Sequence, residues 1–123
     1  MYKNYSKACL VAVTVVCLGA CSSAPKPKTE MALSNSALQN AEVAGAANHA
    51  PIELRTAKEK QALADAAMSR KKFTTAKQLA EQAAVDAEYA KAKSEAEKSR
   101  QAVAEVEDSI NMIRTELNRS DSK

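Results

Sequence analysis

The carboxy-terminal part of this chain contains a long run without proline or glycine, which extends from Thr75 to Arg119. Thr75 and Gln78 have the spacing of a capping box, which marks the start of a helix. With no helix breaker inside it, the run predicts a single helix of more than forty residues, roughly 65 Å long at 1.5 Å per residue. The largest element of the fold is therefore expected to be a rod.

Two shorter helices are predicted before this rod. Gly45 and Pro51 separate them, and Pro51 suits the first turn of the second one. A later start of the first helix at Ser36, with Gln39 completing a capping box, is an alternative. The three helices are expected over residues 30–48, 52–69 and 75–118. The chain is thus predicted to be all-α, either an antiparallel helical hairpin or a three-helix arrangement, with a long C-terminal helix that extends as a coiled coil.

Alanine supplies much of the apolar content and limits the thickness of the core. Apolar residues make up 46% of the chain and aromatic residues only 3%, and alanine buries little surface. A deep pocket for a small-molecule substrate is therefore not expected. Small residues at helical spacing predict the packing faces of the second and third helices, which are Leu54, Ala57, Leu63, Ala64 and Ala67 and then Ala76, Ala80, Ala83, Ala87 and Ala90.

The last part of the long helix carries a different apolar stripe. Large aliphatic residues there follow alternating steps of three and four, the pattern of a heptad seam: Val103, Val106, Ile110, Ile113 and Leu117. The helix of residues 52–69 is too short to cover this seam when it folds back. The seam predicts self-association or a partner helix, because contiguous exposed aliphatic stripes usually mark interaction surfaces. The alternatives are that helix 30–48 or a bent helix 52–69 reaches the seam, or that the helix end frays.

The amino terminus has the order of a bacterial secretion signal. Two lysines precede an uncharged apolar run over residues 8–18, which is shorter than the about 20 residues that a membrane-spanning helix needs. Residues 18–21, Leu-Gly-Ala-Cys, resemble the bacterial lipobox. We expect removal of residues 1–20 as the signal peptide, with cleavage between Ala20 and Cys21, and modification of Cys21 by a diacylglycerol and an N-acyl chain such as palmitate. The alternative is an ordinary secreted protein in which Cys21 is a bystander thiol.

The cysteine count supports acylation. Two of the three cysteines lie within the predicted signal peptide, so the mature chain keeps only Cys21 and cannot form an internal disulfide. Several acyl chains, at about 0.8 kcal/mol per buried methylene, give a stable membrane anchor. Ser22 rather than aspartate follows the cysteine, which by the sorting rule of enteric bacteria implies the outer membrane. Residues 21–29, rich in proline, serine and lysine, are expected to be a tether, and residues 120–123 a flexible tail.

The charged and polar residues do not predict catalysis. After removal of the signal peptide, basic and acidic residues are almost equal in number and interleave, which argues against binding of nucleic acid. His49 is the only histidine and has no second nitrogen or thiol to help it bind a metal. Glu105, Glu107 and Asp108 face different ways on a helix and are interpreted as the solvated side of the coiled coil. We expect no enzymatic activity, no metal and no cofactor.

Several blocks of the helical region resemble a known family. They are Gly45-Ala46, Ala50-Pro51-x-Glu53-Leu54, Ala57, Ala64, Ala67, Phe73, Ala76, Leu79-Ala80-Glu81-Gln82-Ala83, Asp86-Ala87 and Ala90. This pattern is similar to the bacterial lipoprotein family catalogued as domain of unknown function 4398, over the helical body up to residue 105. The resemblance implies an outer-membrane lipoprotein that faces the periplasm, with peptidoglycan-binding partners of the outer-membrane-protein-A type and no assigned reaction.

These features predict an outer-membrane-anchored periplasmic lipoprotein with a structural or interaction role in the cell envelope. It would act through helix–helix association, as a homo-oligomer or with an envelope partner. The alternative is a peptidoglycan-associated or murein-tethering spacer. In that case peptidoglycan would be reached through an outer-membrane-protein-A-like partner or through the carboxy-terminal Lys123, a layout that resembles the murein lipoprotein.

Overall fold

Four α-helices make up the part of the chain that the structure describes. The computed structural model describes residues 25–122, and these contain no β-strand. The helices are α2 (Lys28–Val43), α3 (Ala46–His49), α4 (Pro51–Ser69) and α5 (Phe73–Ser120). The predicted all-α fold with a long C-terminal helix is therefore confirmed.

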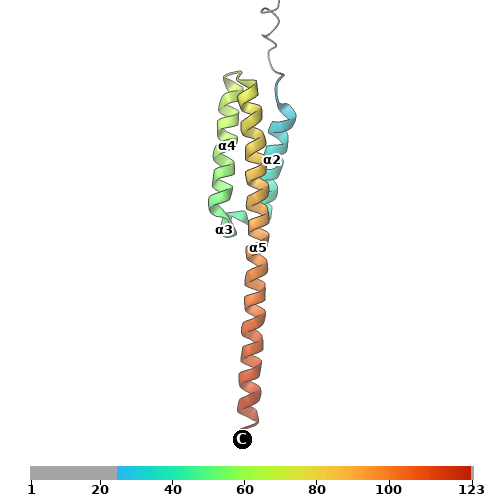
Figure 1. Ribbon diagram of the computed structural model, residues 1–123, viewed down its shortest axis with the longest axis vertical. Coiled ribbons are helices and arrows are strands. Elements are labelled where there is room, and N and C mark those ends of the chain that lie inside the picture. Colours follow the sequence, from blue (N-terminus) through green and yellow to red (C-terminus); the bar gives the residue numbers. More distant parts are fainter. Residues whose placement is uncertain (1–24, 123) are drawn as a thin grey trace, which may run out of the picture.

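The helices form a short three-helix bundle from which α5 projects. Figure 1 shows α2 and α4 running along the first half of α5, with α4 antiparallel to α5 and α2 parallel to it. The single turn of α3 crosses between α2 and α4 near the middle of α5. The second half of α5 extends alone beyond the bundle, so the end of α5 lies far from the start of α2. Of the two predicted arrangements, the three-helix one is found.

Alanine forms most of the bundle core. The buried residues of α5 follow steps of three and four, as the alanine stripe predicts: Ala76, Ala80, Ala83, Ala87, Ala90 and Ser94. The facing residues of α4 are Leu54, Ala57, Gln61, Ala64 and Ala67, and those of α2 are Ser34, Ala37, Leu38 and Ala41. The prediction that Leu63 lies on this face was wrong, because its side chain is 57% exposed. Gln61 occupies the inward position instead, since it continues the spacing from Leu54 and Ala57.

The first helix, predicted over about residues 30–48, begins two residues earlier and ends five residues earlier than predicted. It ends at Val43, because Gly45 adopts a left-handed conformation with φ 82°, which breaks the helix before the four residues of α3. It begins at Lys28, because the Pro27 carbonyl accepts the first helical hydrogen bond, from Met31 N at 3.1 Å. Lys28 and Thr29 thus belong to the helix and not to the predicted tether, and the alternative start at Ser36 lies inside α2.

The long helix also differs from the predicted range of 75–118. It begins at Phe73, two residues before the proposed capping box, and no side chain caps it. Lys71, with φ 56°, makes the tight connection from α4, and its neighbour Lys72 supplies the carbonyl that accepts a hydrogen bond from Ala76 N at 2.9 Å. The connection between α4 and α5 is therefore shorter than the sequence indicates. At the other end the helix continues to Ser120, two residues further than predicted.

Two buried serines tie the helices of the bundle together. In the middle of α2, the Ser34 hydroxyl donates to Gln61 Oε1 at 2.6 Å and ties α2 to α4. At the end of the bundle near α3, the Ser94 hydroxyl donates to the Ala44 carbonyl at 2.8 Å. Ala44 follows the last residue of α2, where carbonyls lack helical partners, so Ser94 replaces alanine in the stripe at the position where a donor is needed.

Ion pairs link the outer faces of the bundle helices. Glu30 of α2 pairs with Lys77 of α5 at 3.1 Å, and Glu53 of α4 pairs with Lys93 of α5. Backbone hydrogen bonding and Lys77 hold the pKa of Glu30 below its usual value, and the hydrogen bond from Lys93 does the same for the pKa of Glu53. Both carboxylates lie in the first turns of their helices, where the helix dipole also favours negative charge.

We expect the bundle to lose thermal stability when the pH falls below 4.5, the ordinary pKa of glutamate. Glu30 and Glu53 have lower pKa values in the folded state, so their contribution is complete above pH 4.5 and is lost as the pH falls through the folded-state values. Circular dichroism melts from neutral to acid pH measure this loss. A Glu30→Gln, Glu53→Gln double variant should be less stable at neutral pH and lose less on acidification. The same acid-induced loss in the variant and the parent would contradict the assignment.

Candidate interaction surface on helix α5

Within residues 25–122, the second half of α5 projects beyond the other helices, and only the Lys98 side chain at its start lies beside Gly45. Ser94 is the last buried residue of the helix, and every residue from 98 to 120 is exposed. We call residues 98–120 the distal segment. At 1.5 Å per residue it projects roughly 34 Å beyond the bundle. Figure 1 shows it as the lower, orange to red part of α5.

The predicted apolar seam lies on this distal segment. The exposed fractions are 57% for Val103, 58% for Val106, 42% for Ile110, 61% for Ile113 and 58% for Leu117. These five residues, called the distal seam below, lie at heptad spacing along one side of the helix. The alternatives in which another part of the chain reaches the seam are wrong for the described residues, because α2, α3 and α4 all pack beside the first half of α5.

The distal seam does not continue the buried alanine stripe. At 100° per residue, the seam lies roughly 140° around the helix from the stripe that ends at Ser94. A helix that prolonged the line of α2 or α4 would therefore miss the seam. The phase change explains why the bundle ends where it does, because beyond Ser94 the side of α5 that faces α2 and α4 carries polar residues such as Gln101 and Asp108.

The distal segment has little to hold it as a lone helix. Eleven of its 23 residues are serine, threonine, asparagine, aspartate, valine or isoleucine, which are only moderate helix formers. The ion pairs Arg100–Glu97 and Arg119–Glu116 are exposed and span one turn, so they contribute little. In proteins most helical stability comes from packing of an apolar face rather than from helix propensity. The segment is therefore a helix whose apolar face lacks a partner within residues 25–122.

Charged side chains flank the distal seam at seven-residue intervals. Arg100, Glu107 and Arg114 each lie one position after an inward-facing residue of the heptad. Glu107 and Arg114 make no ion pair within residues 25–122. The apolar pattern alone does not single out these residues. These three residues are identified by their repeated heptad position beside the seam.

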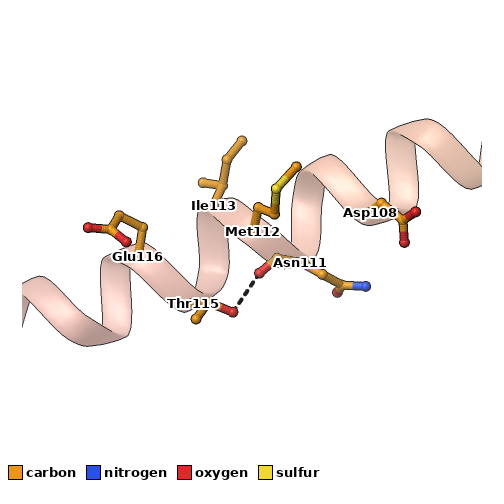
Figure 2. Close-up of a pocket in the computed structure, with 6 residues that line it drawn as sticks. All are labelled: Asp108, Asn111, Met112, Ile113, Thr115 and Glu116. Atoms are coloured by element: carbon orange, nitrogen blue, oxygen red, sulfur yellow. Dashed lines mark hydrogen bonds between the residues drawn. The ribbon is translucent and has the colours of Figure 1, made fainter.

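The surface of the distal segment is not a small-molecule pocket. Figure 2 shows the residues that line a shallow, open hollow on this segment, which are Asp108, Asn111, Met112, Ile113, Thr115 and Glu116. All six side chains come from successive turns of one helix, and Thr115 Oγ1 donates to the Asn111 carbonyl of that helix at 2.8 Å. No other element of the described chain closes the opposite side. A surface of this shape suits a second helix better than an enclosed ligand.

The remaining predicted site residues lie elsewhere. Ala20, Cys21 and Lys123 are outside the described residues. His49 is the half-buried last residue of α3, beside Gly45. Among residues 25–122, no three histidine, cysteine, aspartate or glutamate side chains come close enough to hold a metal ion. No helix in the described part of the chain combines the length and the apolarity needed to cross a membrane.

The chain was compared with known protein families, curated proteins and solved structures. The family described as domain of unknown function DUF4398 matches residues 29–106. The chain belongs to this family. No curated protein and no solved structure is similar enough to count as a match. The DUF4398 match covers the whole three-helix bundle and the first two seam residues, Val103 and Val106, whereas Ile110, Ile113 and Leu117 lie beyond it.

Proposed function

We propose that this protein is a periplasmic lipoprotein, anchored in the outer membrane through Cys21, with a structural role in the cell envelope based on helix–helix association. The observation that carries the association is the exposed distal seam on a helix that projects from the bundle. Such a stripe loses its contact with water only when another helix packs on it. The family match gives no reaction, and the described residues offer no constellation that requires one.

The anchor is proposed from the sequence. The lipobox-like residues 18–21 and the single cysteine of the mature chain support acylation, and Ser22 supports sorting to the outer membrane. The described chain begins at Pro25, at the end of the bundle away from the distal segment. A lipid at Cys21 would thus leave the distal seam exposed at the far end of the molecule.

Labelled palmitate tests the anchor. Cells that express the full chain should incorporate the label into this protein, and a Cys21→Ser variant should lose both the label and the processing of the precursor. Cys17→Ser is the matched control, because it removes a thiol four residues earlier, inside the predicted signal peptide. An unlabelled parent chain, or a Cys21→Ser variant that is matured and localised like the parent, would contradict the lipoprotein proposal.

A murein-tethering spacer is the second candidate. The described chain runs to Ser122 at the tip of the rod, at the opposite end from the start of α2, and the predicted acceptor Lys123 follows Ser122 in the sequence. Its ε-amine is the group that an acyl transfer to peptidoglycan would use. Muropeptide digestion followed by mass spectrometry decides between the two: a Lys123-linked muropeptide supports the spacer, and its absence excludes covalent attachment.

A further inference from the structure

The charges beside the distal seam distinguish between the ways in which a second helix can pack on it. In a two-stranded coil the seam residues form the core, and the flanking positions pair across the interface and set its orientation. The positions beside Val103, Ile110 and Leu117 on one edge are Arg100, Glu107, Arg114 and Asp121. The other edge has Glu95, Ala102, Ser109 and Glu116.

A parallel, in-register pair of two copies gains nothing from these charges. In a parallel coil each residue of one edge faces the residue five positions later on the other edge of the partner helix. Glu95 would then face Arg100 of the second copy, which is favourable, but Glu116 would face Asp121, which is not. The two central contacts involve Ala102 and Ser109 and are uncharged on one side. The favourable and unfavourable contacts cancel.

Two antiparallel registers place four of the five seam residues opposite seam residues of the second copy, and the charges separate these two registers. In an antiparallel coil, equal edges of the two helices face each other. Suppose that Val106 lies level with Ile110 of the second copy. Glu107 then lies opposite Glu107 of that copy, and Arg100 lies opposite its Arg114, so the contacts among these charged residues are repulsive. This register is disfavoured although four of the five seam residues are paired.

The other antiparallel register is complementary throughout. It is shifted by seven residues from the first register. Ile110 then lies level with Ile113 of the second copy. Val106 lies level with Leu117 of that copy, and Val103 lies level with its Ser120. On the charged edge Glu107 then meets Arg114 and Arg100 meets Asp121, each twice because of the twofold symmetry. Glu107 and Arg114 have no competing ion pair within the described chain. Four of the five seam residues lie opposite seam residues in this register.

The shape of the molecule agrees with this arrangement. The distal segment is straight and carries its bundle at one end only, so an antiparallel pair overlaps along residues 103–120 and places the two bundles at opposite ends. Because the seam lies on a different side of α5 from the buried stripe, neither bundle obstructs the second helix. Two chains that are anchored in one membrane would form this pair while lying along the membrane plane.

We propose that the occupant of the distal seam is a second copy of this chain, bound antiparallel in the register that brings Glu107 to Arg114. This inference rests on the association that the proposed function assigns to the seam, but it requires no lipid at Cys21. The interface is short, and its charged contacts lie at the edge. The dimer is therefore expected to weaken as salt is added.

Charge reversal on the full chain in detergent tests the proposal. Glu107→Arg and Arg114→Glu each turn two attractive contacts into repulsive ones, so each variant should dimerise with a Kd raised roughly tenfold or more. A mixture of the two variants restores opposite charges in both contacts between positions 107 and 114. A chain that carries both substitutions restores them as well. Differently tagged copies should therefore form heterodimers in the mixture. Glu105→Arg, the same change on the outer face of the helix, is the control and should leave the Kd unchanged. Sedimentation equilibrium and co-purification of the tags measure these outcomes.

Single cysteines test the register directly. Val103→Cys on one tagged chain and Ser120→Cys on another should form a disulfide-linked heterodimer under mild oxidation, and neither chain should link to itself beyond the level of the parent chain. Self-linking of Val103→Cys together with insensitivity to charge reversal would establish a parallel pair and overturn the proposal. A parent chain that stays monomeric would also overturn it, and would leave the seam to a different partner. Both results are independent of palmitate labelling, which tests the anchor alone.

Discussion

Replacing Ala87 by leucine is expected to lower the free energy of unfolding by about 1–3 kcal/mol, because the core has no room for three more carbons. Ala87 is fully buried where α5 meets Ala41 of α2 and the Leu54 and Ala57 region of α4. Small residues there let the three helices approach closely, so a larger side chain must push them apart. The midpoint of thermal unfolding should fall by roughly 5 to 20 °C for a domain of this size. Circular dichroism melts measure the shift.

Ala92→Leu is the matched control for this prediction. It makes the same change five residues further along the same helix, at an exposed position. Alanine and leucine have similar helix propensities, so the control should melt close to the parent. Equal melting of the Ala87→Leu chain and the control would mean that the alanine stripe is not tightly packed, and the three-helix arrangement would lose its main support.

The buried faces were predictable because they depend on spacing alone. The alanine stripe of α5 repeats every three or four residues, and this period identifies the inward side of a helix without knowledge of its neighbours. The prediction for Leu63 was wrong, because this leucine is hydrophobic but its position along α4 does not face inward. Gln61 has the right phase and is buried, since Ser34 of α2 offers its side chain a hydrogen-bond partner. That partner is distant in sequence and cannot be inferred from the pattern of α4.

The helix boundaries were harder to predict, because backbone conformation decides them. The left-handed conformation of Gly45 ends α2 at Val43, five residues before the predicted end at residue 48, whereas the apolar pattern continues across Gly45. Thr75 and Gln78 have the spacing of a capping box, yet α5 starts before them, because Lys71 adopts a positive φ and shortens the connection. A lysine in that conformation gives no sequence signal, unlike glycine.

The position of the candidate surface was predictable, whereas the sequence predicted its lack of an intrachain partner without excluding the alternatives. The heptad spacing of Val103 to Leu117 is visible in the sequence, but whether α2 reaches it depends on where α2 ends and on which side of α5 it packs. The structure answers both points: α2 ends beside Ser94, and the seam faces another way. The flanking charges become informative only after the seam is known to be exposed, because their pairing depends on the orientation of a partner.

The two halves of α5 differ in the size of their apolar side chains. The first half uses alanine, which permits close packing against α2 and α4 but contributes little apolar area for each residue. The second half uses valine, isoleucine and leucine, which bury much more area when a helix covers them. Large side chains would not fit at the fully buried alanine positions of α5, and alanine buries little apolar area in a two-stranded interface. If the proposed association is correct, the change in side-chain size at the end of the bundle marks the change from intrachain to interchain packing.

Replacing both Ile110 and Ile113 by aspartate is expected to abolish association through the distal seam, with a Kd raised by at least roughly a hundredfold. Helix pairing would place these carboxylates in the core of the interface, where an unpaired charge is costly. The two isoleucines lie in the middle of the seam, so no register that covers the seam avoids them. Sedimentation equilibrium of the full chain in detergent measures the oligomer, and circular dichroism measures the helix content.

The same experiment separates association from folding of the bundle. Ile110 and Ile113 are exposed and far from α2 and α4, so melting of the bundle should not change. Helix content should fall slightly, because the distal segment loses the packing that supports a marginal helix. Met112→Asp is the control: it puts one carboxylate between the two positions, on a side chain that is 66% exposed and lies outside the seam. If Met112→Asp disrupts the oligomer as strongly as the double variant, the partner does not bind along the seam, because only a contact on another face of α5 would respond in that way.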